Sequence, residues 1–141
     1  MIPKIEMTNY KEYFLRDRFA TNNGIELVEC RPGYSKVQLK VEDRHLNGAD
    51  VVHGGVLFTM ADFAFAAAVN SYGNVTLSIN AYISYFKAST EGILTAECNE
   101  ISRSNRLTSC EINIYDESRQ LLANFRGTGY ITKGIISEFE N

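Results

Sequence analysis

A long apolar segment in the middle of the chain constrains the fold more than any other feature. Across residues 56–69 the side chains are apolar, small or a lone threonine, and Asp62 carries the only charge. The segment is shorter than the roughly 20 apolar residues that span a bilayer. A helix that is apolar on nearly every side must be enclosed by other elements. We therefore expect one buried helix over about 53–71 that ends near Gly73.

The rest of the chain alternates apolar and polar residues with the period of two that β-strands show. Residues 25–41 predict a hairpin, with Pro32 and Gly33 in its turn. A short amphipathic helix is expected at 9–20, with Thr8 as its N-cap. Four more strands are expected at 75–86, 93–101, 107–115 and 121–131. The pattern predicts an α+β fold in which a curved antiparallel sheet of about six strands wraps around the long central helix.

Composition and charge exclude several classes of protein. With 141 residues, 45% of them hydrophobic, and no linker or internal repeat, the chain is expected to form one domain over residues 1–141. A net charge of −3 lacks the positive field that gives proteins non-specific affinity for nucleic acid. Three cysteines, which cannot all pair, and an N-terminus without the apolar core of a signal peptide favour a cytoplasmic protein. We expect neither nucleic acid nor a membrane as a partner.

Asp62 is the first candidate for a chemical role. A carboxylate removed from water is destabilised unless a partner compensates for the lost solvation, and burial raises its pKa. Such a carboxylate suits a general base or a nucleophile. The alternative is a structural aspartate that accepts hydrogen bonds from the backbone or from a serine or threonine.

The glycine pair Gly54-Gly55 at the expected helix start is the second candidate. The first amides of a helix have no acceptor within the helix, and the helix dipole adds positive charge there. Such donors suit a carbonyl oxygen that gains negative charge, although paired glycines also mark ordinary tight turns. Gly54 and Asp62 are eight residues apart, which is roughly 12 Å along a helix. If both act on one carbonyl, the protein must be at least a dimer, with each subunit providing one of them.

The loop before the helix holds two further candidates. The Asn47 side-chain amide is able to orient water or substrate, or it only forms the turn with Gly48. His53 adjoins the glycine pair and is assigned a positioning role, either on substrate or as a helix cap. No second His or Cys stands at a ligand spacing from it, so no metal is expected. We expect His45 to be a solvated loop residue without a role.

The central block resembles the signature of a known family. Its characteristic residues are Asn47, the run His53-Gly54-Gly55, Asp62 and the run Asn70-Ser71-Tyr72-Gly73. This spacing is similar to that of the hotdog-fold acyl-CoA thioesterases of the PaaI-like group, named after phenylacetic acid degradation. The resemblance implies a hotdog fold, homodimers joined edge to edge through their sheets, frequent pairing into tetramers, and active sites shared between subunits.

The resemblance also implies roles for individual residues. Asp62 would act as base or nucleophile, the Gly54 amide would polarise the thioester carbonyl, and Asn47 would position water or substrate. Ser78 would assist Asp62 from the strand after the helix, where Thr76 and Asn80 are the other polar choices. Three basic residues are candidates to bind the phosphates of coenzyme A, although exposed charges mostly only interact with water: Lys87, Arg103 and Arg106. Coenzyme A is then part of the substrate, and no metal or bound cofactor is expected.

Two other functions remain open at this point. The first alternative to a thioesterase is a hotdog module that binds acyl-CoA without turnover. The second is a hotdog dehydratase or hydratase, although such an enzyme would pair a catalytic histidine with a separate carboxylate. The acyl group is not determined by the sequence. Phe14, Tyr82 and Phe86 are candidates to line an acyl pocket, and each has core packing as an alternative role.

Overall fold

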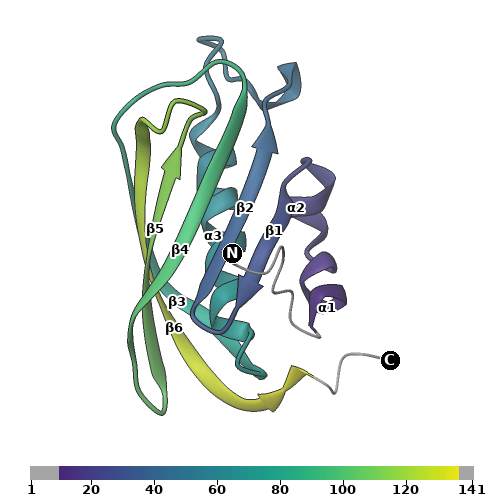
Figure 1. Ribbon diagram of the computed structural model, residues 1–141, viewed down its shortest axis with the longest axis vertical. Helices are drawn as coiled ribbons and strands as arrows, with labels where there is room; N and C mark the ends of the chain where they lie inside the picture. Colours follow the sequence, from purple (N-terminus) through teal and green to yellow (C-terminus); the bar gives the residue numbers. More distant parts are fainter. Residues whose placement is uncertain (1–9, 137–141) are drawn as a thin grey trace, which may run out of the picture.

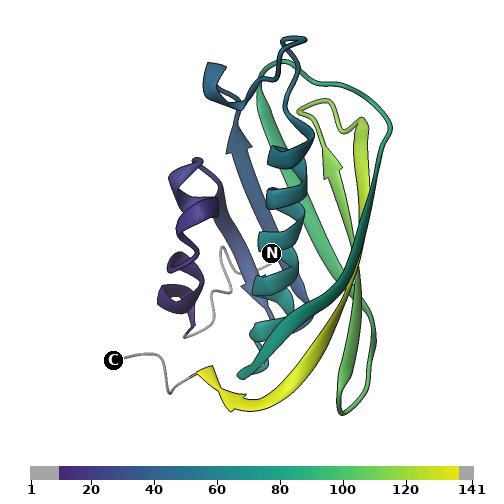
Figure 2. The same ribbon diagram turned by 180° about the vertical axis from the view of Figure 1, so that it is seen from behind.

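The apolar segment forms the long helix α3, Gly54–Asn70, which confirms the expected central helix. The computed structural model describes residues 10–136. The helix lies in the hollow of the sheet, as Figures 1 and 2 show from opposite sides. Met60, Ala61, Phe63 and Ala64 are all buried although they point in different directions around the helix. The helix is therefore enclosed except along one face, where Thr59, Asp62 and Ala66 are half-buried.

Six antiparallel strands form one curved sheet around this helix, as predicted. They lie in the order β1-β2-β4-β5-β6-β3, so that β1 and β3 are the two edges. The strands are β1 Glu26–Arg31, β2 Tyr34–Lys40, β3 Asn74–Tyr85, β4 Ile93–Arg103, β5 Leu107–Tyr115 and β6 Leu121–Ile135. The last strand extends four residues beyond the predicted end at residue 131, because its pairing with β3 continues to Ile135 opposite Asn74.

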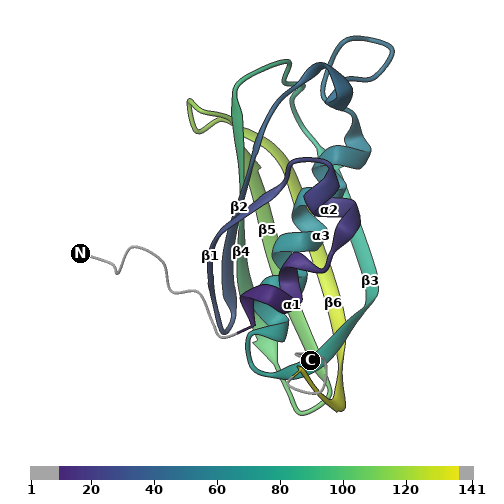
Figure 3. The ribbon, with the colours of Figure 1, turned by 90° about the vertical axis from the view of Figure 1, so that its right-hand side faces the viewer.

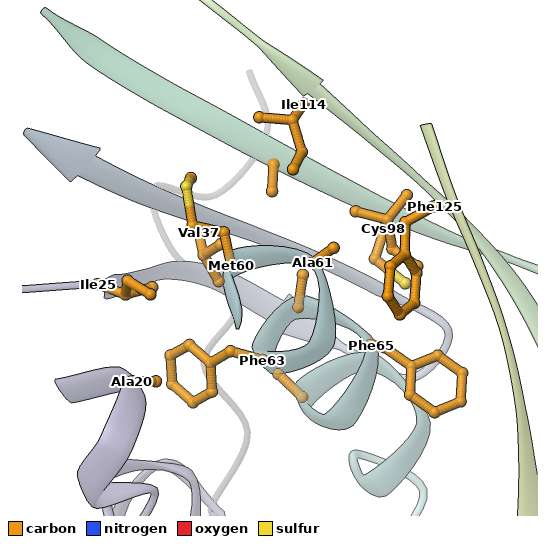
Figure 4. Close-up of a cluster of buried hydrophobic side chains, with 14 of the residues drawn as sticks. Ala20, Ile25, Val37, Met60, Ala61, Phe63, Phe65, Cys98, Ile114 and Phe125 are labelled. Atoms are coloured by element: carbon orange, nitrogen blue, oxygen red, sulfur yellow. The ribbon is translucent and has the colours of Figure 1, made fainter. Parts of the chain in front are cut away.

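The core lies between the inner face of the sheet and α3. Phe63 and Phe65 of the helix point to different sides of it, and Phe65 lies near Phe125 of β6 (Figure 4). Cys110, Ile112 and Ile114 of β5 are fully buried, which confirms the alternation predicted for that strand. Within residues 10–136, no helix is long and apolar enough to cross a membrane.

The N-terminal segment forms two short helices instead of the single helix predicted at 9–20. They are α1, Lys11–Leu15, and α2, Arg18–Asn22. The chain breaks at Asp17, whose carboxylate accepts a hydrogen bond from the Ala20 amide at 3.0 Å and caps α2. An aspartate competes in this way with continuation of a helix. The expected cap Thr8 lies outside the described residues. Both helices lie beside α3 on the side away from the sheet (Figure 3).

His45 is fully buried, so its expected role as a solvated loop residue is wrong. It ends the short 3-10 helix η1, Asp43–His45. Its Nδ1 accepts a hydrogen bond from the Glu42 amide at 2.9 Å, and its Nε2 lies 2.7 Å from the Asn23 carbonyl oxygen. Since Nδ1 is an acceptor, Nε2 carries the proton and donates to Asn23. These backbone partners satisfy the ring, which therefore does not need solvent.

All three cysteines are buried and unpaired. Burial raises the pKa of the Cys30 thiol to about 11, although a hydrogen bond with Ser71 acts in the opposite direction. A thiol with such a pKa is almost wholly protonated at neutral pH and is a poor nucleophile. The cysteines therefore contribute to packing.

Candidate active site

The start of α3 leaves one backbone donor free. His53 is the N-cap residue, and its Nδ1 accepts a hydrogen bond from the Gly55 amide at 2.8 Å. The proton of the ring is therefore on Nε2, and the ring is exposed. The Gly54 amide donates to no acceptor within residues 10–136. His53 thus caps the helix, one of the two roles expected for it, and the donor that remains open is Gly54.

Tyr85 lies against Gly54. Its hydroxyl donates to the Gly54 carbonyl oxygen at 3.1 Å. A side chain at position 54 would place its Cβ 3.1 Å from the tyrosine ring, which explains why glycine fits there. Beside both residues is a pocket of about 340 Å³, which is also lined by Leu57, Phe86 and Lys87. The free amide therefore adjoins a space that a ligand is able to enter.

Asp62 is half-buried in the middle of α3. Its pKa is raised, mainly because burial disfavours the charged carboxylate and secondarily because the negative charge of Asp17 is near. No donor within residues 10–136 makes a hydrogen bond to it, and the nearby Thr59 hydroxyl donates to the Gly55 carbonyl oxygen instead. The alternative of a structural aspartate held by backbone or hydroxyl donors therefore does not occur in the described part of the chain.

A second pocket lies along α3 beyond Asp62. Its volume is about 380 Å³, and it lies between the N-terminal helices and α3. Its walls combine three aromatic rings with three charged side chains: Tyr13, Phe14 and Phe63, and Arg16, Asp17 and Arg18. Ala66 also lines it, one helical turn after Asp62 and therefore on the same face of α3. Asp62 itself is not part of this lining, so of the two groups only Gly54 belongs to the wall of a pocket.

Asn47 lies in the loop before α3 and stabilises its turn. Its Oδ1 accepts hydrogen bonds from the amides of Ala49 at 2.9 Å and Val51 at 3.3 Å. This is the turn-forming role that was the alternative to contact with water or substrate. Its side-chain nitrogen makes no hydrogen bond within residues 10–136 and is still available as a donor.

Ser78 and Lys87 belong to the edge strand β3 and the loop that follows it. Ser78 is exposed and shares its face of β3 with Thr76, since the strand alternates regularly between these two residues. Lys87 donates to the side chain of Gln120 and lines the pocket beside Gly54. The structure therefore brings Lys87 into the surroundings of the free amide. Ser78, which was expected to assist Asp62, makes no hydrogen bond to it within residues 10–136.

Arg103 and Arg106 lie at the other end of the molecule, on the hairpin between β4 and β5. They line a polar pocket of about 570 Å³ together with Asn74 and Lys133. Arg103 forms an ion pair with Glu100 at 3.0 Å, and Arg106 donates to the Tyr130 hydroxyl at 3.0 Å. Because Asn74 follows the end of α3 and Gly54 begins it, about 25 Å of helix separates this pocket from Gly54 in one chain.

Three residues at these sites were not predicted from the sequence: Asp17, Tyr85 and Lys133. Asp17 had a local signal, because an aspartate followed by helix-forming residues is typical of an N-cap. Tyr85 and Lys133 had none, because their partners are far away along the chain. Within residues 10–136, no group of three or more His, Cys, Asp or Glu side chains is arranged to hold a metal ion.

The edge strand β3 is the remaining surface next to these features. Leu77, Ile79 and Tyr82 are exposed by 57, 59 and 57%. Exposed apolar side chains on a long unpaired edge are typical of a strand that pairs with another chain. The geometry thus combines a free amide, an isolated carboxylate roughly 12 Å away along the helix, and an apolar edge.

Comparison with known proteins identifies this arrangement. The family model of the thioesterase superfamily matches residues 49–123, a range that starts in the loop before Gly54 and includes Asp62. A putative esterase of Archaeoglobus fulgidus is 40% identical over 105 residues, which are 74% of this chain and 68% of that protein. The chain belongs to the thioesterase superfamily.

This thioesterase is also similar to the acyl-coenzyme A thioesterase PaaI of Escherichia coli. The two are 29% identical over 130 residues, 92% of this chain and 93% of the relative. The solved structure of E. coli PaaI covers 90% of this chain and 93% of its own with a TM-score of 0.86 and 28% identity. A variant of PaaI from Thermus thermophilus, also 28% identical, has a TM-score of 0.78 and covers 82% of this chain and 100% of its own. These findings confirm the resemblance to PaaI-like hotdog thioesterases, and the protein is a thioester hydrolase.

Proposed function

We propose that this thioesterase hydrolyses acyl-CoA thioesters as a homodimer, with Asp62 of one protomer and the Gly54 amide of the other acting on one thioester. The substrate class is that named for the PaaI relative. The observation that carries the proposal is that the two glycine amides differ. The Gly55 amide donates to His53 Nδ1, whereas the Gly54 amide has no acceptor within residues 10–136. A helix N-terminal amide left open in this way is suited to a developing oxyanion.

The reaction follows from these two groups. The thioester carbonyl oxygen accepts a hydrogen bond from the Gly54 amide, which stabilises the negative charge that forms there. Asp62 either takes a proton from the attacking water or attacks the carbonyl carbon itself. In both cases the carbon gains an oxygen from water in the end, the C–S bond breaks, and the sulfur leaves as the thiol of coenzyme A. This chemistry requires no metal or bound cofactor, and dialysis against a chelator is expected to leave turnover unchanged.

The edge of β3 supports the dimer. Two such edges related by a two-fold axis pair antiparallel, which places the end of β3 in one protomer opposite its beginning in the other. Tyr85, which contacts Gly54, would then lie near Asn74 of the second protomer. Asn74 lines the basic pocket of Arg103 and Arg106. The pairing would therefore bring the basic pocket of one subunit next to the Gly54 pocket of the other, where the phosphates of coenzyme A need positive charge. Pairing of such dimers into tetramers, by a second interface, also belongs to the proposal.

The experiment measures thiol release by the wild type and by Asp62→Asn across a panel of acyl-CoA substrates. Asn preserves the shape of the side chain but cannot act as a base, so kcat is expected to fall by about 10²- to 10⁴-fold. Melting curves of both proteins exclude misfolding as the cause. Near-normal hydrolysis by folded Asp62→Asn would contradict the catalytic role. Binding of acyl-CoA by the wild type without thiol release would favour a carrier module, and addition of water to an enoyl-CoA would favour a hydratase.

A further inference from the structure

The hydroxyl group of Tyr85 makes a contact that the proposed reaction does not yet use. It donates to the Gly54 carbonyl oxygen at 3.1 Å, in the peptide unit that directly follows the open amide. We propose that Tyr85 is a positioning residue for this reaction: its hydrogen bond fixes the peptide unit after Gly54 and so orients the Gly54 amide toward the thioester oxygen. The inference rests on the proposed function, because it takes the Gly54 amide as the oxyanion donor.

Two glycines in succession need such a contact. Glycine has no Cβ and adopts a wider range of backbone angles than any other residue. The Gly54 amide lies on one side of the Gly54 Cα and the rest of α3 on the other, so the backbone angles at Gly54 set the direction of the amide relative to the helix. A catalytic donor must keep its position to within about 0.5 Å and its direction to within about 10–20°. The freedom of the glycine pair therefore has to be removed by other groups.

The peptide unit between Gly54 and Gly55 is held at both ends by side chains. Its amide donates to His53 Nδ1 at 2.8 Å, and its carbonyl oxygen accepts from Tyr85. The peptide unit before it is held within the helix, because the His53 carbonyl oxygen accepts from the Val56 amide at 2.9 Å. Of these three contacts, only that of Tyr85 comes from outside α3 and its cap. Tyr85 therefore joins the start of the helix to the sheet.

Tyr85 is itself well placed to hold another group still. It is the last residue of β3 and is paired with Ala123 of β6, and the amide of the next residue, Phe86, donates to the Leu122 carbonyl oxygen at 2.8 Å. Its ring lies so close to Gly54 that a Cβ there would be 3.1 Å away. A tyrosine side chain has only two χ angles. The backbone pairing and the ring contact together determine where the hydroxyl lies.

The hydroxyl of Tyr85 keeps the proton that this hydrogen bond requires. A carbonyl oxygen only accepts, so the phenol has to be the donor. Burial raises the pKa of Tyr85 above its ordinary value. The phenol is therefore protonated at neutral pH, and the contact with Gly54 persists there.

The first test removes the hydroxyl alone. Tyr85→Phe keeps the ring against Gly54, and with hexanoyl-CoA we expect kcat to fall about tenfold, less than the roughly 10²- to 10³-fold that loss of a whole oxyanion donor costs. KM should change by less than about twofold, since the donor acts mainly when charge develops on the oxygen. Tyr115→Phe is the matched control. It removes a tyrosine hydroxyl at the same end of the sheet, from a ring that stacks on Arg119, and should leave both constants unchanged.

Two analogues of the substrate separate a positioning role from a merely structural one. Trifluoroacetonyl-CoA carries a ketone that becomes tetrahedral on hydration and so resembles the reacting carbon, whereas S-hexyl-CoA has no carbonyl. Tyr85→Phe should weaken inhibition by the ketone about tenfold, in parallel with kcat, and leave inhibition by S-hexyl-CoA unchanged. Equal weakening of both would indicate a general disturbance of the binding site and would overturn the proposal. Melting curves establish that each variant is folded.

A double-mutant cycle shows whether Tyr85 acts through the Gly54 amide. Gly54→Pro removes this amide, so adding Tyr85→Phe should weaken binding of the ketone no further. A full tenfold loss in the Gly54→Pro background would place the hydroxyl on the substrate itself and overturn the proposal. An unchanged kcat in Tyr85→Phe alone would do the same, while the proposed function would stand. If Gly54→Pro is as active as the wild type, or if no acyl-CoA releases thiol, the proposed function fails and the inference fails with it.

Discussion

The two edges of the sheet are built in opposite ways. The β1 edge is six residues long, carries an irregularity between Leu27 and Glu29, and pairs the Glu29 carboxylate with Lys36 at 3.3 Å and with Arg31 at 3.8 Å. The β3 edge is twelve residues long and exposes large apolar side chains. Short, charged and bulged edges prevent pairing with other chains. Only the β3 edge is therefore shaped for a partner.

The carboxylates near the two edges differ in the same sense. Glu29 on β1 has two cationic partners, whereas Asp62, one turn before the pocket that adjoins β3, has neither a hydrogen bond nor an ion pair within residues 10–136. A half-buried carboxylate with a raised pKa and no partner is a candidate for a reactive group, whereas an ion-paired one on an edge strand is typical of a structural role. The β1 side is thus built for stability, and the β3 side has the features of a reactive interface.

Breaking the β3 edge should have the largest effect. Ile79→Lys places a charge in the proposed interface, so we expect monomers and a loss of thioesterase activity of about 100-fold or more, because each active site needs both subunits. Glu29→Gln, the matched change on the β1 edge, should leave both properties unchanged. Light scattering and thiol release measure them. A fully active monomer would contradict the shared site.

Mixed dimers sharpen the same comparison. Gly54→Pro removes the amide donor, and the backbone accepts it: position 54 is the first residue of α3, and His53 has the extended ψ of 134° that a following proline requires. The proline Cβ would meet the Tyr85 ring at 3.1 Å, so Gly54→Ala, which makes the same contact but keeps the amide, is the control and should retain more activity. Gly54→Pro and Asp62→Asn should each be nearly inactive alone.

Dissociated and reassembled together, these two variants form some dimers in which one of the two sites is intact. About a quarter of wild-type turnover should return. If mixing restores nothing although mass spectrometry detects the mixed dimers, then Gly54 and Asp62 do not cooperate across the interface.

The pH dependence of turnover tests the isolation of Asp62. Burial and, to a lesser degree, the charge of Asp17 raise the pKa of Asp62. The ionised carboxylate is the active form, so turnover should fall as the pH drops through this raised pKa. Asp17→Asn removes one cause and keeps the cap on α2, so the acid limb of the kcat/KM profile should move modestly to lower pH. A limb that does not move, or moves upward, would contradict the influence of Asp17.

The smallest expected effect is on stability. A carboxylate whose pKa is higher in the folded than in the unfolded state binds its proton more tightly when folded, so its contribution to stability is lost as pH rises through the folded pKa. Asp62→Asn should therefore melt at the same or a higher temperature than the wild type at neutral pH, with the difference disappearing in acid. Glu29→Gln should instead lose about 0 to 1 kcal/mol of unfolding free energy. Calorimetry at both pH values checks the two signs.

The sequence predicted the elements whose signal is periodic. The central helix and the strands could be placed because burial repeats along them with a fixed period, and Asp62 was recognisable as the single charge in an apolar helix. Its neighbour Asp17 was missed, because a cap within a short amphipathic segment looks like one more exposed charge. His45 was wrongly predicted to be exposed to solvent, because its hydrogen-bond partners are backbone atoms and the Asn23 carbonyl lies 22 residues away along the chain. Contacts of that kind leave no pattern in the residues themselves.

His45 also joins the end of α2 to the start of α3. Through its ring it holds the end of α2, and its carbonyl oxygen accepts the His53 amide at 2.8 Å just before Gly54. The anchor on α2 is a main-chain carbonyl, which every amino acid provides. The sequence of α2 is therefore free to vary at this contact, whereas a substitution of His45 would loosen the end of α2 and the backbone just before Gly54 at the same time.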